Sequence, residues 1–298
     1  MMRFTFFSLC FTAFALAAGE KQAVSKSVEQ PEMGRSGLFL GLGGSYNSVK
    51  LDQHLSGDAV SSVFLEGTST QVASGQAGGP IAPWHETLNT FAPETQIGYF
   101  GHFGSSPWLW GCEFFYKYLG LVFSSAEVVF QAGKFNTVTG VSDNFTGHAI
   151  ARSMQVTVNN ELSLMALFGR SFKKSYLYVG AGPVLYGTHT NIYSLTGYAD
   201  INGNGGTDIT GNPVTLFNSL WMWGGGGELG GTWFVSPRWF LDINYSYLVT
   251  GRNPIHDIVS FSNVTQTNPA LSDAGKIFLS LSQRITTQAL TVSVNFLW

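Results

Sequence analysis

The sequence predicts an all-β fold: a transmembrane antiparallel up-and-down β-barrel of eight strands, with short turns at one end and four long loops at the other. Three observations support this prediction. Hydrophobic residues make up 44% of the chain and charged residues only 11%, against roughly 25% charged in an average soluble domain. Beyond residue 18 there is no apolar run long enough for a membrane-spanning helix. Instead, apolar and polar residues alternate over eight separate segments, as they do in half-exposed strands.

Residues 1–18 have the features of a secretory signal peptide. Arg3 precedes an apolar run that ends in the small residues of Ala15-Leu16-Ala17, so cleavage is expected after Ala17 or Ala18. Residues 19–36 are polar and read as a flexible periplasmic tail. The barrel is then expected over residues 37–298. Cys112 is the only cysteine left after cleavage, so an internal disulfide cannot stabilise this fold.

The first four predicted strands each place large apolar residues at every second position. In the third, Trp108, Trp110 and Phe114 share one face, and Glu113 and Lys117 lie on the other. The first is rich in glycine on its polar face. The four segments are 38–47, 91–103, 108–118 and 159–168.

The last four predicted strands repeat the pattern. In the sixth, Trp221 and Leu229 oppose Glu228, and in the seventh Ile243 and Tyr245 oppose Asp242. The closing segment alternates apolar residues with Thr, Ser and Asn up to the end of the chain. The four segments are 177–185, 221–233, 241–247 and 290–298.

The connections between these strands fall into two classes of length. Gly104–Pro107, Arg170–Ser175 and Ser236–Arg238 are tight turns, whereas the loops 52–88, 124–152, 187–218 and 250–283 are far longer than a usual connection. Short periplasmic turns and long extracellular loops are typical of bacterial outer-membrane barrels.

Aromatic residues flank the tight turns and close the chain. Side chains of this kind at one level of a barrel predict an aromatic girdle at a membrane interface. The predicted girdle consists of Phe103, Trp108, Phe168, Tyr176, Trp233, Trp239, Phe296 and Trp298.

Three segments carry a resemblance to a known family. The glycine-rich LFLGLGGSYN, the related YLYVGAGPVLYG and the closing LTVSVNFLW are similar to strands of the OmpA-like and opacity-protein family of eight-stranded outer-membrane barrels, over roughly Gly37 to Trp298. The resemblance implies the bacterial outer membrane and recognition of the last strand, ending at Trp298, by the barrel-assembly machinery. The loops are longer than is usual in the family, and a ten-stranded barrel remains the alternative.

The polar face of the predicted strands contains an ionic cluster. If Phe103 and Trp108 face each other across the first turn, paired residue numbers sum to 211, and Glu94 lies opposite Lys117. Glu161 reaches a similar height on the next strand. Glu113, Glu228 and Asp242 are expected lower on the same wall. Five carboxylates around one lysine require trapped water or protonated acids. The cluster either pins the register or forms the charged constriction of a pore.

Catalytic, metal and nucleic-acid signals are weak. Residues 54–56 (His-Leu-Ser) and 189–190 (His-Thr) belong to no nucleophile elbow or H-E-x-x-H helix, so an enzyme is not predicted and no cofactor is expected. Residues 200–205 match part of a calcium loop, but Gly211 stands where a bidentate acid is needed, and an Asn/Gly turn is the better interpretation. The candidate ligands would be Asp200, Asn202, Asn204 and Asp208. No basic cluster suggests nucleic acid.

Together these features predict an integral outer-membrane surface protein with a filled lumen and a structural or adhesin-like role through its long loops. A small pore or an outer-membrane barrel hydrolase is the alternative. Expected partners are membrane lipid, host or surface ligands of the loops, and lipopolysaccharide. Phosphates of lipopolysaccharide could meet a rim of basic residues. That rim comprises Lys50, Arg152, Arg252, Lys276 and Arg284.

Overall fold

The computed structural model describes residues 35–80, 83–137, 142–201, 204–208, 213–265 and 270–298, and all regular structure in these ranges is β. No helix in these ranges is long and apolar enough to cross a membrane. The predicted signal peptide and all but the last two residues of the predicted tail lie outside the described residues. The strands are β1 (Gly37–Leu65), β2 (Gln71–Pro80), β3 (Trp84–His102), β4 (Trp108–Thr137), β5 (Ser142–Ser171), β6 (Ser175–Ile201), β7 (Asn204–Asp208), β8 (Val214–Phe234), β9 (Trp239–Thr250), β10 (Asn253–Thr265) and β11 (Leu271–Leu297).

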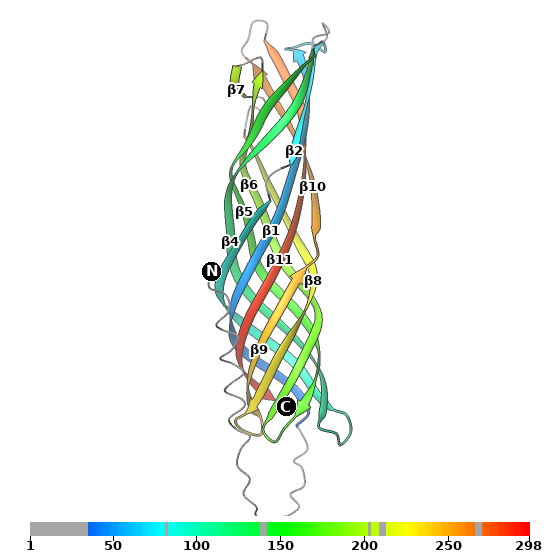
Figure 1. Cartoon of the computed structure of the whole chain (residues 1–298), viewed down its shortest axis with the longest axis vertical. Helices are drawn as coiled ribbons and strands as arrows, with labels where there is room; N and C mark the ends of the chain where they lie inside the picture. Colours follow the sequence, from blue (N-terminus) through cyan, green and yellow to red (C-terminus); the bar gives the residue numbers. More distant parts are fainter. Residues whose placement is uncertain (1–34, 81–82, 138–141, 202–203, 209–212, 266–269) are drawn as a thin grey trace, which may run out of the picture. The chain divides into compact units, whose positions relative to one another are not determined.

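Eight of these strands form a closed antiparallel ring (Figure 1). The ring runs β1, β3, β4, β5, β6, β8, β9 and β11. It closes because β11 pairs back onto β1 from Phe39↔Leu297 to Leu65↔Leu271. The other three strands, β2, β7 and β10, pair only with the outer parts of ring strands. The predicted eight-stranded barrel is therefore confirmed, and the described residues do not form a ten-stranded ring.

Three tight turns define one end of the barrel, which we call the turn end. Phe103 N donates to Trp108 O at 3.1 Å, Phe172 N to Ser175 O at 2.7 Å, and Val235 N to Trp239 O at 3.0 Å. The first and last ring strands meet at the same end, where Trp298 N donates to Leu38 O at 2.8 Å. The opposite end, which carries β2, β7 and β10, is called the loop end.

An apolar belt surrounds the outside of the barrel near the turn end. On β1 the outward side chains are apolar from Leu38 to Tyr46, which is nine residues, and a membrane-spanning strand needs about 9–11. The outward positions that follow are mostly polar, beginning with Ser48 and Lys50. The series has the same nine-residue length on β11 and the following residue, over 290–298, and spans eleven residues on β9, over 239–249. Such an exterior is stable only against lipid, because water would leave a continuous band of apolar surface exposed.

Most of the predicted long loops are strands in the structure. The β4–β5 pair continues to Asn136↔Ser142, far beyond the predicted strand ends at 118 and 159, and β1 continues to Leu65. The reason is that a strand outside lipid no longer needs large apolar residues on its outer face, so its alternation is weak in the sequence. Hydrogen bonds to a neighbouring strand satisfy the backbone N–H and C=O groups of these segments without that pattern.

Candidate functional site

The charged side chains of the barrel interior form one buried cluster around Lys117. Lys117 Nζ lies 3.2 Å from Glu94 Oε2 and 3.4 Å from Glu161 Oε1, and none of the three side chains is more than 1% exposed. They come from three neighbouring strands, because Glu94 pairs with Lys117 between β3 and β4, and Lys117 pairs with Glu161 between β4 and β5. The tight turn at 103–107 fixes this register.

Further contacts hold the lysine and its partner in place. Thr291 on β11 donates from Oγ1 to Glu94 Oε2 at 3.0 Å. The Lys117 ammonium also lies 4.6 Å from the centre of the Phe115 ring, a favourable position for a cation over an aromatic face. The Glu94–Lys117–Glu161 bridge is therefore an enclosed ion pair network rather than a solvated surface pair.

A second group of acids lies nearer the turn end. Tyr178 Oη donates to both carboxylate oxygens of Asp242, at 3.0 and 2.9 Å, and Asn244 Nδ2 donates to Oδ2 at 3.1 Å. Glu113 is 1% exposed and Glu228 6% exposed. Within the described ranges, neither oxygen of Glu228 has a hydrogen-bond partner. The interior therefore holds more carboxylates than Lys117 alone can neutralise.

Apolar side chains fill the barrel on both sides of these acids. At the turn end, Phe39 and Phe100 stack with ring centres 4.9 Å apart, and Phe240 contacts both rings. Toward the loop end the next inward positions are again buried and apolar. They include Val49, Leu51, Phe123, Val156, Met222, Leu248 and Ile285.

Tyr176 corrects the predicted aromatic girdle. It is 2% exposed and points inward, where its hydroxyl donates to Arg35 O. Tyr176 lies close to the tight turn, but the alternation of side chains along β6 makes its neighbour Leu177, which is 46% exposed, the outward residue. The other seven face outward at the turn end. These are Phe103, Trp108, Phe168, Trp233, Trp239, Phe296 and Trp298.

The two histidines considered for catalysis, His54 and His189, lie on different strands, β1 and β6, and His54 lies beside a third histidine, His85, with ring centres 6.2 Å apart. His189 Nδ1 is 2.6 Å from Ser219 Oγ, between β6 and β8. His85 Nδ1 is 2.6 Å from Asp52 Oδ1, between β3 and β1, and Lys50 Nζ lies 2.8 Å from the same oxygen. The serine–histidine pair and the histidine–acid pair are therefore parts of separate sites.

Asp52 lies above the apolar belt and faces solvent in part. Burial alone would raise the pKa of its carboxyl group, but the hydrogen bonds and charges of Lys50 and His85 outweigh burial and lower this pKa. Asp52 is therefore an ionised surface carboxylate near neutral pH.

The candidate calcium ligands fall in and around a β-hairpin. Asp200 lies in β6, and Asn204 and Asp208 delimit β7, which pairs with β6 through Ile201↔Asn204 and Tyr198↔Asp208. Asn202 lies outside the described residues. Among the residues that the structure describes, no group of three His, Cys, Asp or Glu side chains could hold a metal ion.

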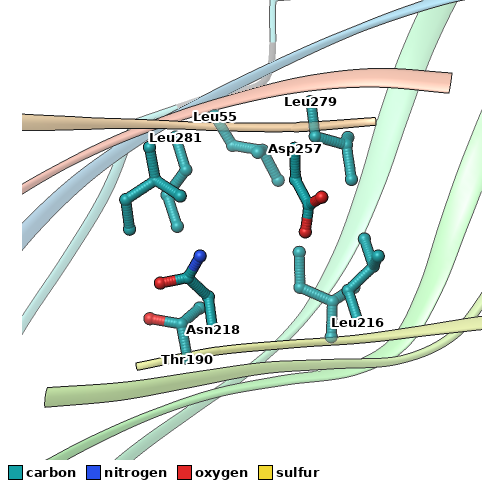
Figure 2. A pocket seen from close by; sticks show the side chains of 9 residues that line it. Leu55, Thr190, Leu216, Asn218, Asp257, Leu279 and Leu281 are labelled. Atoms are coloured by element: carbon teal, nitrogen blue, oxygen red, sulfur yellow. The ribbon is translucent and has the colours of Figure 1, made fainter. Parts of the chain in front are cut away.

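A pocket that the sequence did not indicate lies inside the loop end (Figure 2). About 320 Å³ of space not filled by atoms adjoins its lining, and because this volume includes open solvent, the enclosed part is much smaller. The walls are mostly aliphatic. They are formed by Leu55, Ile192, Leu216, Ile255, Leu279 and Leu281. Three polar side chains complete the lining: Thr190, Asn218 and Asp257.

The sequence did contain a signal for the β10 side of this pocket. Ile255, Asp257, Val259 and Phe261 alternate with outward residues and carry the inner face of β10. This segment falls within the predicted loop 250–283.

Comparisons with known proteins give structural likeness without close relatives. No family model matches the chain, and no curated protein matches it. Neisserial surface protein A aligns at 12% identity and a TM-score of 0.33, over 85% of this chain and 97% of that one. Outer membrane protein OprG of Pseudomonas aeruginosa aligns at 10% identity and a TM-score of 0.34, over 88% of this chain and 96% of that one. Ail, the attachment invasion locus protein of Yersinia pestis, aligns at 12% identity and a TM-score of 0.29, over 81% of this chain and 98% of that one. The fold itself is established by the hydrogen-bonded ring described above.

Proposed function

We propose that this protein is an integral barrel of a bacterial outer membrane that holds a long β-structure above the membrane, with a structural or adhesive role at the cell surface. The observation that supports this most directly is the inverted burial: acids and a lysine lie inside, and a nine-residue apolar belt lies outside. This is the distribution that a lipid solvent demands of a barrel.

The packing of the interior favours this role over that of a pore. An eight-stranded barrel has an interior just wide enough for side chains to fill. Here the stacked rings of Phe39 and Phe100 lie on one side of the ionic cluster, and buried residues such as Leu51 and Phe123 lie on the other. Ions would have to displace both layers.

The rim of basic residues supports contact with lipopolysaccharide phosphates. Lys50, Arg252, Lys276 and Arg284 are exposed at or beyond the loop-end edge of the apolar belt. Lys50 also pairs with Asp52, but an exposed ion pair contributes little and leaves the ammonium able to bind an anion. The side chain of Arg152 lies outside the described residues.

The last strand supports recognition by the barrel-assembly machinery. β11 ends at Leu297 beside Trp298, and it pairs with β1 to close the ring. A strand that closes the ring, and that carries exposed aromatic residues near the turn end, is a suitable signal for a machine that closes barrels.

The strands that extend beyond the belt at the loop end would contact other molecules at the cell surface. The ligands we propose for them are surface or host molecules.

Topology on intact cells tests this proposal. An epitope inserted at Gly75, in β2 at the loop end, should be detected on intact cells, whereas one at Ser105, in a tight turn, should be detected only after the outer membrane is opened. Detection at Ser105 on intact cells would invert the proposed orientation.

Heat modifiability and conductance complete the test. The folded protein from outer-membrane fractions should migrate differently on gels before and after boiling, as a closed barrel resists detergent. In planar bilayers it should give no steady conductance. A stable conductance that changes with Lys117→Met would favour the pore instead.

A further inference from the structure

The loop-end pocket lies at a seam in the wall of the barrel. Above the belt, the outer part of β8 pairs with β6 on one side, from Ile192↔Leu216 to Gly187↔Trp221. β10 pairs with β11 on one side. Within the described ranges, no ladder joins β8 to β10. Gly251 N donates to Trp223 O at 3.0 Å. Beyond this hydrogen bond, toward the loop end, the described residues of β8 and β10 are not joined by a ladder.

The lining comes from both sides of this seam. Leu216 and Asn218 belong to β8, and Ile255 and Asp257 belong to β10, while Leu279 on β11 lies behind them. Because the pocket is partly open to solvent, a small molecule can reach its aliphatic walls. Exposed Trp221 and Trp223 place the base of the seam at the outer edge of the apolar belt.

The pocket contains one negatively charged side chain, Asp257. Figure 2 shows the carboxylate of Asp257 and the amide of Asn218 pointing into the space from opposite sides. Asp257 is half-buried and accepts a hydrogen bond through Oδ1 from Ile258 N, at 2.9 Å. Among the described residues no basic side chain forms an ion pair with it. Thr190 already accepts a hydrogen bond from Gln283 at 2.9 Å.

We propose that this pocket binds a small amphiphile with a short apolar chain and a protonated amine as its head group. The aliphatic walls would take the chain, since apolar area removed from water drives binding. The second carboxylate oxygen of Asp257 would accept a charge-assisted hydrogen bond from the ammonium, and Asn218 would accept another through its amide oxygen. The limited space restricts the ligand to a short, unbranched chain.

The test uses three eight-carbon ligands that carry different head groups. The full-length protein, labelled with ¹³C at isoleucine δ1 methyls, is placed in phosphatidylcholine nanodiscs and titrated with octylamine, octanoate and octanol. Octylamine should shift the methyl signals of Ile192 and Ile255 and bind about tenfold more tightly than octanoate, the size expected of one charge-assisted bond. Because the signals come from the pocket, ligand dissolved in lipid gives no signal of its own, and each affinity is calculated from the free concentration that remains after partition into the lipid.

Two variants and a control separate the two parts of the site. Asp257→Asn should abolish the preference for octylamine and retain octanol binding, and Leu216→Trp should fill the space and weaken all three. Asp58→Asn, at an exposed outward position of β1, should change nothing. Equal affinity for octylamine and octanoate, an unchanged preference in Asp257→Asn, or unchanged binding in Leu216→Trp would each overturn the proposal.

Discussion

Lys117 is the residue on which the electrostatics of the barrel interior depend most. It is the basic partner of Glu94 and Glu161, and all three are buried. Removing it would leave two carboxylates without their counter-ion in a medium that solvates charge poorly. Breaking a buried ion pair by deleting one partner costs about 3–5 kcal/mol. We therefore expect Lys117→Met to lower the free energy of unfolding by about this amount, measured by urea unfolding in detergent micelles.

The matched control is Lys276→Met at the exposed, loop-end end of β11. An exposed lysine gains little from its neighbours, so this variant should unfold within about 0.5 kcal/mol of the parent. A Lys117→Met protein as stable as Lys276→Met would show that the acids of the interior are neutral without the lysine.

Asp273 gives the loop end a dependence on pH. Burial raises the pKa of its carboxyl group to about 6, although a hydrogen bond from Ser61 opposes the rise. A raised acid pKa means that the folded protein binds the proton more tightly than the unfolded chain, so stability falls as pH rises from about 4 through 6.

The corresponding measurement compares Asp273→Asn with the parent protein. The variant lacks the ionisable group, so the parent should lose stability relative to it between pH 4 and 6 and should show no further relative loss above pH 7. The carboxyl carbon of Asp273 should titrate with a midpoint near 6 in NMR spectra. A midpoint near 4 would contradict the burial seen here.

At the scale of the element, the spacing between β1 and the β3–β4 pair depends on a glycine. A Cβ atom at Gly98 would overlap the Phe39 ring and the carbonyl oxygen of Cys112. Overpacking of this kind costs about 1–3 kcal/mol, so Gly98→Ala should be destabilised by that amount in urea unfolding. Gly44→Ala is the control, because its Cβ would meet only Ala92 O at 3.7 Å. Equal stability of the two variants would mean that β1 and β3 can separate without cost.

The sequence predicted the strands that cross the apolar belt and missed those above it, for a physical reason. Within the belt, lipid selects large apolar residues at most outward positions, as in Leu38, Leu40 and Leu42. Above it the outward residues of β1 include Asp52 and Asp58, so the alternation disappears although the strand continues to Leu65.

The same distinction applies to the sites. The position of Glu94 opposite Lys117 follows from a turn of known length and from counting, which a sequence allows. The pocket brings together residues from β1, β6, β8, β10 and β11. No local pattern encodes such a meeting, and the unpaired edges of β8 and β10 depend on how the whole ring closes.

Over the whole molecule, the same strands pass through two different surroundings, lipid near the turn end and water near the loop end. Near the turn end the outer face is solvated by lipid, and near the loop end the outer face is more polar, although single apolar side chains such as Val60 remain exposed there. An identical substitution should therefore have different effects at the two levels, although it is made at outward-facing residues of the same type and similar exposure.

Val294 and Val60 provide this comparison. Both face outward, with exposed fractions of 48% and 43%. Val294 lies in the middle of the belt on β11, between Leu290 and Trp298, whereas Val60 lies on β1 well beyond Tyr46. A lysine at the bilayer midplane costs about 2–4 kcal/mol, and near or beyond the interface about 0–1 kcal/mol. Val294→Lys should therefore lower the free energy of unfolding in lipid vesicles by about 2–4 kcal/mol, and Val60→Lys should leave it nearly unchanged. Equal effects at the two positions would show that the belt does not face lipid.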